Sequence, residues 1–366
     1  LDDLTINHIA AGEVVERPLS VVKELVENAL DAGASVVSCD IRNGGISSIV
    51  VTDNGCGMDR VDARMAFERH ATSKLRTIGD LDAIGTMGFR GEALASIASV
   101  SRIQLRTRRP EDELGIELTL EAGTIIRESE VGCPSGTRIQ VENLFHNVPA
   151  RFKFLKKDAT EAGHIVEFIG RMALSRPDVS FRLVNQGNEL LHTPGNNDGS
   201  STLHSVLGRD MARSLVPLAE DGESGILTLG GYAGPPSLGR STRQHQAFFL
   251  NGRWIRSRVI GAAVDEAYKG RLVKGTHPVV ILFLKIPSNL VDVNVHPQKL
   301  EVRFMDEGVV FRAVYHALQN ALAAGEAVAA FDLQPRPRTG EMPGSRLAEP
   351  QAAEPGMPTA GAPGEP

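Results

Sequence analysis

The chain has 366 residues, enough for two domains of ordinary size, or for two domains and a tail. Hydrophobic residues make up 42% and charged residues 23%, a composition that excludes wholesale disorder. The longest purely apolar run, residues 279–284, is far shorter than the roughly 20 residues of a membrane helix. The net charge of −6 excludes a uniformly basic nucleic-acid-binding protein but still allows a local basic surface.

Cysteine and histidine usage restricts the metal chemistry. The chain has three cysteines, Cys39, Cys56 and Cys133, and none of them forms a C-x-x-C pair. This pattern argues against a disulfide framework or a structural zinc site and favours a reducing compartment. The ten histidines show no ligand spacing such as H-E-x-x-H, so we expect no catalytic zinc in this fragment. No basic and then apolar segment opens the chain, so no secretory signal is visible.

The first block of the chain opens with a predicted helix. Pro18 suits its first turn, and apolar residues recur at helical spacing from Val21 to Leu30, before a stop at Gly33. The strands predicted after it are 36–41, 46–52, 103–107, 114–120, 137–141 and 179–184, and the helices are 61–70, 92–98 and 161–174. This mixture predicts an α+β sandwich with a largely antiparallel sheet.

A turn-forming cluster at residues 194–200 precedes a second block. Its predicted strands are 226–232, 247–250, 279–286 and 291–295, and its predicted helices are about 259–268 and 308–323. Asn251-Gly252 is typical of a tight turn. From residue 335 onward there are eight prolines, five glycines and no aromatic residue, which predicts a disordered linker toward further chain. The predicted domains are therefore 1–198 and 199–330, followed by a Pro-rich linker at 331–366.

A glycine-rich stretch lies directly before the helix predicted at Glu92. Gly85, Gly88 and Gly91 leave backbone N–H groups bare at a helix N-terminus, an arrangement that suits a phosphate group. A mobile surface loop explains this stretch equally well. The chain contains no Gly-Lys dipeptide, so a P-loop is excluded.

The sequence D-N-G-C-G-M at 53–58 follows a predicted strand. The Asp53 carboxylate could accept a hydrogen bond from the exocyclic amine of adenine, where guanine has a carbonyl, while the glycines admit a flat ligand. A plain Asp-Asn-Gly turn without a ligand is the competing interpretation.

Glu24 and Asn28 are four residues apart and share one face of the first helix. A carboxylate can polarise an attacking water, and an amide oxygen can complete the coordination of Mg²⁺. A solvated helix face accounts for most such pairs. Glu27 points about 100° away from Asn28 and is given no role.

The order of these motifs is more specific than any one of them. Together with I-A-A-G-E-V-V-E-R-P at 9–18, R-H-A-T-S-K at 69–74, G-F-R-G-E-A-L at 88–94 and V-N-V-H-P-Q-K at 293–299, the chain resembles the MutL family of DNA mismatch-repair ATPases over about residues 5–330. That family belongs to the GHKL class. Gln298 departs from the small residue that the family more often has there.

The resemblance implies a GHKL-type α/β sandwich, followed by a smaller, ribosomal-protein-like domain with a left-handed βαβ crossover. It implies that Glu24 is the general base of a Mg²⁺-dependent ATPase and that Asn28 is the Mg²⁺ ligand. Residues 72–91 would form a lid over the phosphates, and Lys299 would reach the γ-phosphate from the second domain. The other implied ATP contacts are Asp53, Gly57, Lys74, Gly88, Phe89, Arg90, Gly91, Thr137 and Asn294.

A basic segment runs from Arg240 to Lys274, with eight basic residues against two acidic ones and a local charge of +6. A solvated charged surface and a footprint for a phosphate backbone both fit this composition. The resemblance favours DNA and singles out Arg258, with Arg253 and Arg256 beside it. Trp254 fits a core position better than a base-stacking one.

The implied function is an ATP-driven switch in DNA mismatch repair. The protein would dimerise on ATP, bind DNA largely regardless of sequence, and couple a mismatch-recognition protein to a downstream nuclease or helicase. It would work in the cytoplasm, on the nucleoid if the source is bacterial, with no membrane partner. Two alternatives stay open: another GHKL enzyme such as a gyrase-like topoisomerase subunit, and a nucleotide-gated scaffold with incidental hydrolysis.

Overall fold

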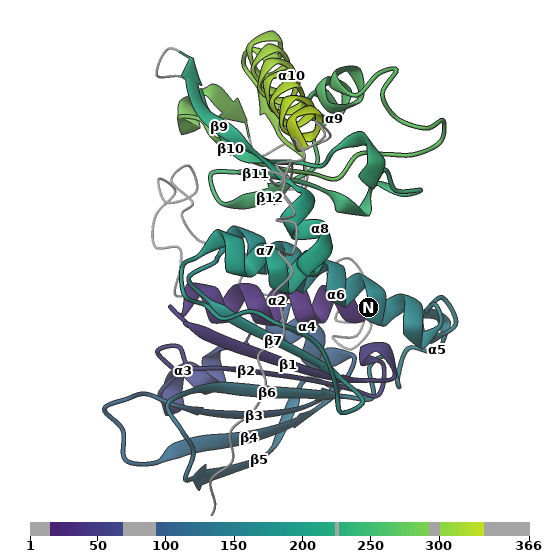
Figure 1. Cartoon of the computed structure of the whole chain (residues 1–366). Coiled ribbons are helices and arrows are strands. Elements are labelled where there is room, and N and C mark those ends of the chain that lie inside the picture. Colours follow the sequence, from purple (N-terminus) through teal and green to yellow (C-terminus); the bar gives the residue numbers. More distant parts are fainter. Residues whose placement is uncertain (1–14, 69–92, 224–226, 293–300, 333–366) are drawn as a thin grey trace, which may run out of the picture. The chain divides into compact units, whose positions relative to one another are not determined.

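The computed structural model describes residues 15–68, 93–223, 227–292 and 301–332, with the backbone alone for 220–223 and 325–332 (Figure 1). The helices are α2 (Pro18–Asp31), α3 (Arg60–Met65), α4 (Ala93–Ser99), α5 (Pro149–Phe152), α6 (Asp158–Ser175), α7 (Gly199–Leu207), α8 (Arg209–Ser214), α9 (Arg258–Ala267) and α10 (Glu307–Asp332). The chain divides into two compact units at Gly325. Within the described ranges, no helix has the length and apolar character needed to cross a bilayer.

The first sheet is mixed but largely antiparallel, with the strand order β5-β4-β3-β6-β2-β1-β7-β8. Only the β1–β7 pair is parallel among its strand pairs. The strands are β1 (Val36–Arg42), β2 (Ser48–Asp53), β3 (Arg102–Arg108), β4 (Gly115–Glu121), β5 (Thr124–Val131), β6 (Gly136–Glu142), β7 (Ser180–Asn185) and β8 (Asn188–His192). Helices α2, α4 and α6 cover one face of this sheet (Figure 1), which confirms the expected α/β sandwich.

Helix α2 forms where the sequence predicts it. Pro18 occupies its first turn, and its apolar stripe from Val21 to Leu30 is buried in the main core. The Ala34 N–H donates to the Ala29 carbonyl and the Gly33 N–H to the Leu30 carbonyl, while Gly33 has a φ of 74°. This is a Schellman ending, which requires the left-handed conformation that glycine adopts without strain.

The second sheet has the order β12-β11-β13-β10-β9. Its strands are β9 (Val216–Glu223), β10 (Leu227–Ala233), β11 (Gln246–Leu250), β12 (Arg253–Ile255) and β13 (Val280–Lys285), while β14 (Val291–Asp292) and β15 (Arg303–Phe304) pair separately. The parallel pair β11–β13 is connected through α9, as a βαβ crossover requires. The left hand of that crossover stays a prediction.

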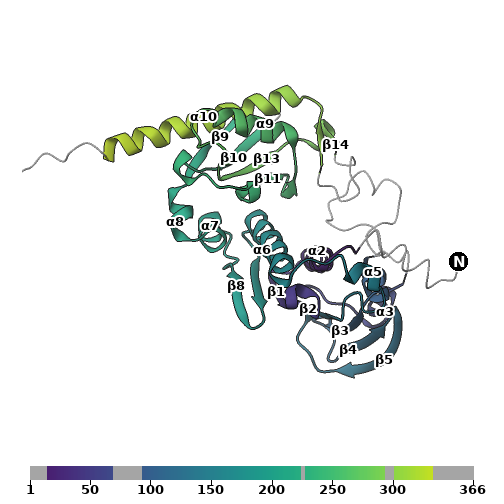
Figure 2. The same ribbon diagram turned by 90° about the vertical axis from the view of Figure 1, so that its right-hand side faces the viewer.

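Both faces of the second sheet are buried, which explains its continuous apolar runs. Figure 2 shows α9 and α10 along one face, where Phe248 and Leu282 join their core. The alternate residues Phe249 and Ile281 face the opposite way and pack with Leu203 of α7. Successive strand residues point to opposite faces, so a run without polar residues fits a strand covered on both sides.

The predicted elements differ from the structure mainly at the edge strands of the sheets and at the ends of individual elements. Strands β5, β8, β9 and β12 went unpredicted, and all four lie at the edge of a sheet. Strands β5 and β8 have several exposed residues and so lack a clear apolar alternation. Strand β2 begins at Ser48 rather than at residue 46, because residues 43–45 form a 3₁₀ turn. Helix α3 ends at Met65 instead of continuing toward residue 70. The domain boundary at residue 198 stays a prediction.

Candidate nucleotide-binding site and basic segment

Glu24 and Asn28 lie on the face of α2 that is turned away from the apolar core. Both are half-buried, whereas Leu25 and Ala29 beside them are buried in the core. Because the helix is fixed by that apolar stripe, it presents a carboxylate and a carboxamide one turn apart on a partly accessible face. This is the arrangement that the spacing predicts.

Asp53 is the last residue of β2 and lies directly across from Thr137 of β6. Burial raises the pKa of the Asp53 carboxyl, and hydrogen bonds from the backbone N–H groups of Gly55 and Thr137 lower it again in part. The Gly55 N–H donates to Asp53 Oδ1 at 2.9 Å. A partly desolvated carboxylate held by backbone donors is well suited to accept one specific hydrogen bond from a ligand.

A short polar wall stands beside Asp53. Thr107 of β3 pairs in register with Thr137, and their hydroxyl oxygens are 3.1 Å apart. The Met58 N–H donates to Thr107 Oγ1 at 2.9 Å, so the wall also holds the end of the glycine-containing loop. The structure therefore brings together Asp53, Gly57 and Thr137, three of the residues that the family resemblance implies as ATP contacts.

Gly57 is required by a close backbone approach. Its φ is 67°, and a Cβ atom there would lie 2.1 Å from the Arg108 carbonyl oxygen. Gly136, with a φ of 111°, would place a Cβ atom 2.2 Å from the Asp53 carbonyl oxygen. Side chains at either position would force the loop away from the sheet.

The loop is also tied to the end of α2. The Cys56 N–H donates to the Ala32 carbonyl at 3.0 Å, and the Asn54 carboxamide accepts from the Val36 N–H at 2.8 Å. Asp53 on one side and the Glu24–Asn28 face on the other thus belong to one connected frame.

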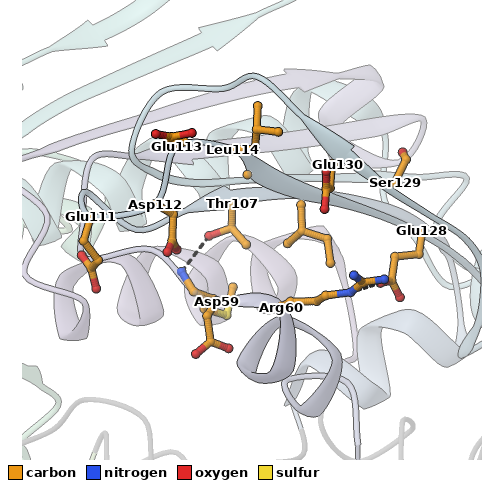
Figure 3. Close-up of a pocket in the computed structure, with 13 residues that line it drawn as sticks. Asp59, Arg60, Thr107, Glu111, Asp112, Glu113, Leu114, Glu128, Ser129 and Glu130 are labelled. Atoms are coloured by element: carbon orange, nitrogen blue, oxygen red, sulfur yellow. Dashed lines mark hydrogen bonds and ion pairs between the residues drawn. The ribbon is translucent and has the colours of Figure 1, made fainter.

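A separate hollow of about 480 Å³ lies between α3 and strands β4 and β5 (Figure 3). It shares Met58 and Thr107 with the wall described above. Its only lining arginine among the described residues, Arg60, is paired with Glu128 at 2.6 Å. The acidic residues that line it are Asp59, Glu111, Asp112, Glu113, Glu128 and Glu130. Such a surface repels a triphosphate, so this hollow is a poor place for the phosphate end of a nucleotide.

Several predicted contacts lie outside the described residues. They are Lys74, Gly88, Phe89, Arg90 and Gly91 in the predicted lid, and Asn294 and Lys299 before β15. Their roles stay predictions.

Both acidic residues of the basic segment form ion pairs with basic residues of the same segment. Arg243 pairs with Asp265 at 2.8 Å, and Lys269 pairs with Glu266 at 3.1 Å. Arg258 is exposed as the first residue of α9, and Arg256 is exposed just after β12, whereas Arg253 is half-buried. The structure thus places Arg256 and Arg258 where a phosphate backbone could reach them.

Glu27 is a buried carboxylate that the sequence analysis set aside. Its side chain is 15% exposed, and its Oε1 lies 3.9 Å from Lys23 Nζ. Burial raises the pKa of Glu27 to about 7, while Lys23 and Arg253 lower it and Glu24 raises it. The helical angle separated Glu27 from Asn28 correctly, but it gave no sign that other parts of the chain cover this side of the helix.

Two family models match separate parts of the chain. Residues 16–151 match the model described as "Histidine kinase-, DNA gyrase B-, and HSP90-like ATPase". Residues 203–323 match "DNA mismatch repair protein, C-terminal domain". The first match defines the class as a GHKL ATPase fold, and the second disfavours a gyrase-like subunit.

Individual relatives point to one family. The DNA mismatch repair protein MutL of Desulforudis audaxviator (strain MP104C) is 50% identical over 322 residues, covering 88% of this chain and 57% of that protein. The structure "Aquifex aeolicus MutL ATPase domain complexed with ADP" is 30% identical with a TM-score of 0.57, over 75% of this chain and 93% of that one. A crystal structure of the "N terminal domain of a DNA repair protein" has a TM-score of 0.75 at 26% identity, over 88% and 99%.

The chain belongs to the MutL family of DNA mismatch repair proteins. It spans about half the length of the curated relatives it matches.

The raised pKa of Glu27 predicts a pH-dependent stability. Because the folded pKa of about 7 lies above the ordinary 4.5, the folded state holds a proton in this window that the unfolded state has lost. Stability therefore falls as the pH rises through the window. We expect Glu27→Gln to raise the free energy of unfolding by about 2–3 kcal/mol at pH 8 and by less than about 1 kcal/mol at pH 5.

Urea denaturation at both pH values measures this difference. Glu121→Gln, which changes an exposed carboxylate at the end of β4, is the control and should track the unchanged chain at both values. An equal effect of Glu27→Gln at pH 5 and pH 8 would contradict the assignment.

Proposed function

We propose that this chain is the ATP-binding and ATP-hydrolysing part of a mismatch-repair switch that dimerises on ATP and binds DNA. The observation that carries the proposal is the frame shared by Asp53, Gly57, Thr137 and the Glu24–Asn28 face, in a chain of the MutL family. The whole protein would couple a mismatch-recognition protein to a downstream nuclease or helicase. ATP hydrolysis by this chain, with and without single-stranded DNA, tests the proposal.

Adenine recognition follows from the acceptor at Asp53. The exocyclic N–H of adenine would donate to the carboxylate, whereas the carbonyl of guanine would place an acceptor against an acceptor. The close approach of Gly57 to the Arg108 backbone would hold the loop beside Asp53, where the base would bind. This difference in hydrogen bonding would select ATP over GTP.

The donor set on α2 fits Mg²⁺ bound mainly through a nucleotide. Mg²⁺ usually takes one or two protein oxygens and completes its shell with phosphate oxygens and waters. The Asn28 amide oxygen would supply the protein ligand, and the bound ion would neutralise phosphate charge. Glu24, one turn away, would orient a water and accept its proton as the water attacks the γ-phosphate.

The division of labour between domains is also proposed. Residues 1–198 would bind ATP, residues 199–330 would supply Lys299 and the DNA-binding face, and residues 331–366 would be a linker. The ranges of the two family matches, 16–151 and 203–323, support a boundary between them.

Substitutions of Glu24 and of Asn28 should affect different steps, hydrolysis of ATP in the first case and binding of Mg·ATP in the second. We expect Glu24→Ala to reduce ATP hydrolysis by at least about 100-fold while binding of Mg·ATP is kept, because a general base acts on the transition state. We expect Asn28→Ala to weaken binding of Mg·ATP itself. Nucleotide titrations and turnover assays on both variants separate the two effects.

Glu27→Gln is the matched control on the same helix and should leave both binding and DNA-free hydrolysis within about twofold of the unchanged chain. Equal loss of Mg·ATP binding in Glu24→Ala and Asn28→Ala would overturn the assigned roles.

The basic segment should bind DNA through phosphates. We expect Arg258→Glu to weaken binding to all DNA sequences alike and to lower the slope of log affinity against log salt by about 1–2, because fewer counterions are released. Binding of ATP should persist. Arg127→Glu, at an exposed position on β5, is the control. If Arg258→Glu binds DNA as the control does, the segment is only solvated surface.

Assembly should depend on the γ-phosphate. Lys299 can neutralise a γ-phosphate that ADP lacks, so only the triphosphate has a differential contact with which to favour the closed, dimeric state. Light scattering should show a monomer without nucleotide or with ADP, and a dimer with a non-hydrolysable ATP analogue. Lys299→Ala should reduce this change, while Lys285→Ala, an exposed lysine of β13, should not. A mass that is the same in all three nucleotide states would refute the switch.

A further inference from the structure

Strand β12 lies at the edge of the second sheet and carries Trp254. The Arg171 guanidinium of α6 lies 4.1 Å from the centroid of the Trp254 ring, and the Arg256 guanidinium lies 5.3 Å from the same centroid. Contacts between α6 and β12 accompany this stack. One ring therefore joins an arginine of the sandwich to an arginine of the basic segment.

The stack is electrostatically strained. Burial lowers the pKa of Arg171, and the charge of Arg256 lowers it further, while the ion pair with Glu167 raises it. Arg171 has an exposed side-chain fraction of only 15%, and its Nε is buried without a hydrogen-bond partner among the described residues. Two cations share one aromatic ring here, and Glu167 is the counter-charge that the structure pairs with Arg171.

An anion at Arg256 would relieve this strain. A DNA phosphate beside the exposed Arg256 would offset its repulsion of Arg171 and so strengthen the stack from outside. The coupling is reciprocal. A state of the sandwich that favours Arg171 on the Trp254 ring would therefore increase the affinity for a phosphate beside Arg256.

The stack leads toward the proposed catalytic face. Helix α6 packs against α2, which carries Glu24 and Asn28. The backbone of Arg256 also forms an isolated parallel β-bridge with Glu301, which helps to hold the Arg256 backbone in place. Strand β12 therefore contacts α6, which in turn packs against the helix that carries the proposed catalytic face.

We propose that β12 is the joint between the two parts: through it, binding of DNA to the basic segment and binding of ATP to the sandwich change each other's affinity. Trp254 is the positioning residue of this joint. The inference rests on the proposed function, because it needs a chain that binds both ATP and DNA. Trp254 touches neither ligand in this account. It sets the relative placement of Arg171 and Arg256.

Trp254 is the only tryptophan in the chain, so its fluorescence reports on the joint directly. Single-stranded DNA without nucleotide, and a non-hydrolysable ATP analogue with Mg²⁺ but without DNA, should each change the emission. Arg171→Gln should abolish the response to the analogue while the analogue still binds. Arg176→Gln, which removes an exposed pair with Asp178 at the end of α6, is the matched control and should respond normally.

The coupling itself is measured as the ratio of DNA affinities with and without the ATP analogue. We expect a ratio of about fivefold or more in the unchanged chain and a ratio within about twofold of unity in Trp254→Leu. Trp254→Phe, which keeps an aromatic face, should retain most of the ratio. A purely structural role of the ring would lower both affinities and leave their ratio unchanged.

The outcomes separate this inference from the proposed function. A chain that binds no ATP analogue or no DNA refutes the proposed function and, with it, the joint. A chain that binds both, with a ratio of unity or with silent Trp254 emission, overturns the joint and leaves the proposed function standing. Trp254→Leu with an intact ratio also overturns it, and a normal thermal unfolding transition shows that the variant is folded.

Discussion

The attachment of the 53–58 loop to the C-terminal end of α2 is the constraint on which the candidate site depends. Gly33 ends the helix, and the Ala32 carbonyl that this ending leaves exposed accepts the Cys56 N–H. The proposed base-reading carboxylate and the proposed catalytic helix face come from separate elements, and neither alone would bind a nucleotide with specificity. One backbone hydrogen bond, two glycines and the pairing of β2 with β6 hold them in a single geometry.

That geometry is rigid because most of it is backbone and core. The apolar stripe of α2 is buried, and Thr107 connects three backbone segments through a single hydroxyl. The polar residues at the junction between α2, α6 and β12 are of another kind. Glu27 has a raised pKa, and the buried Nε of Arg171 finds no hydrogen-bond partner within the part of the chain that the structure describes. Buried polar groups that are only partly satisfied contribute little net stability, so a modest change in charge can shift their arrangement.

The sequence predicted elements wherever packing follows a period. Helix α2 and the strands from β1 to β4 were found because one face or one stripe of each is apolar. Strands β5 and β12 were missed, since an exposed edge strand and a three-residue strand carry no periodic signal. Asp53 and Thr137 could be paired only through family resemblance, because 84 residues separate them and strand register is a tertiary property.

Trp254 shows most clearly why contacts between distant parts of the chain could not be predicted from the sequence. From the sequence alone a large hydrophobic residue such as tryptophan is best assigned to a core, and nothing there connects Trp254 with an arginine 83 residues earlier. The structure packs Trp254 half-buried against the hydrophobic cluster of Leu203 and Phe249, which agrees with the predicted core position, but it also places two arginine guanidinium groups over its ring. A switch that couples two ligands needs a contact weak enough to be shifted by either of them. The placement of Arg171 and Arg256 on the Trp254 ring meets that requirement, because the repulsion between the two cations depends on whether an anion lies beside them.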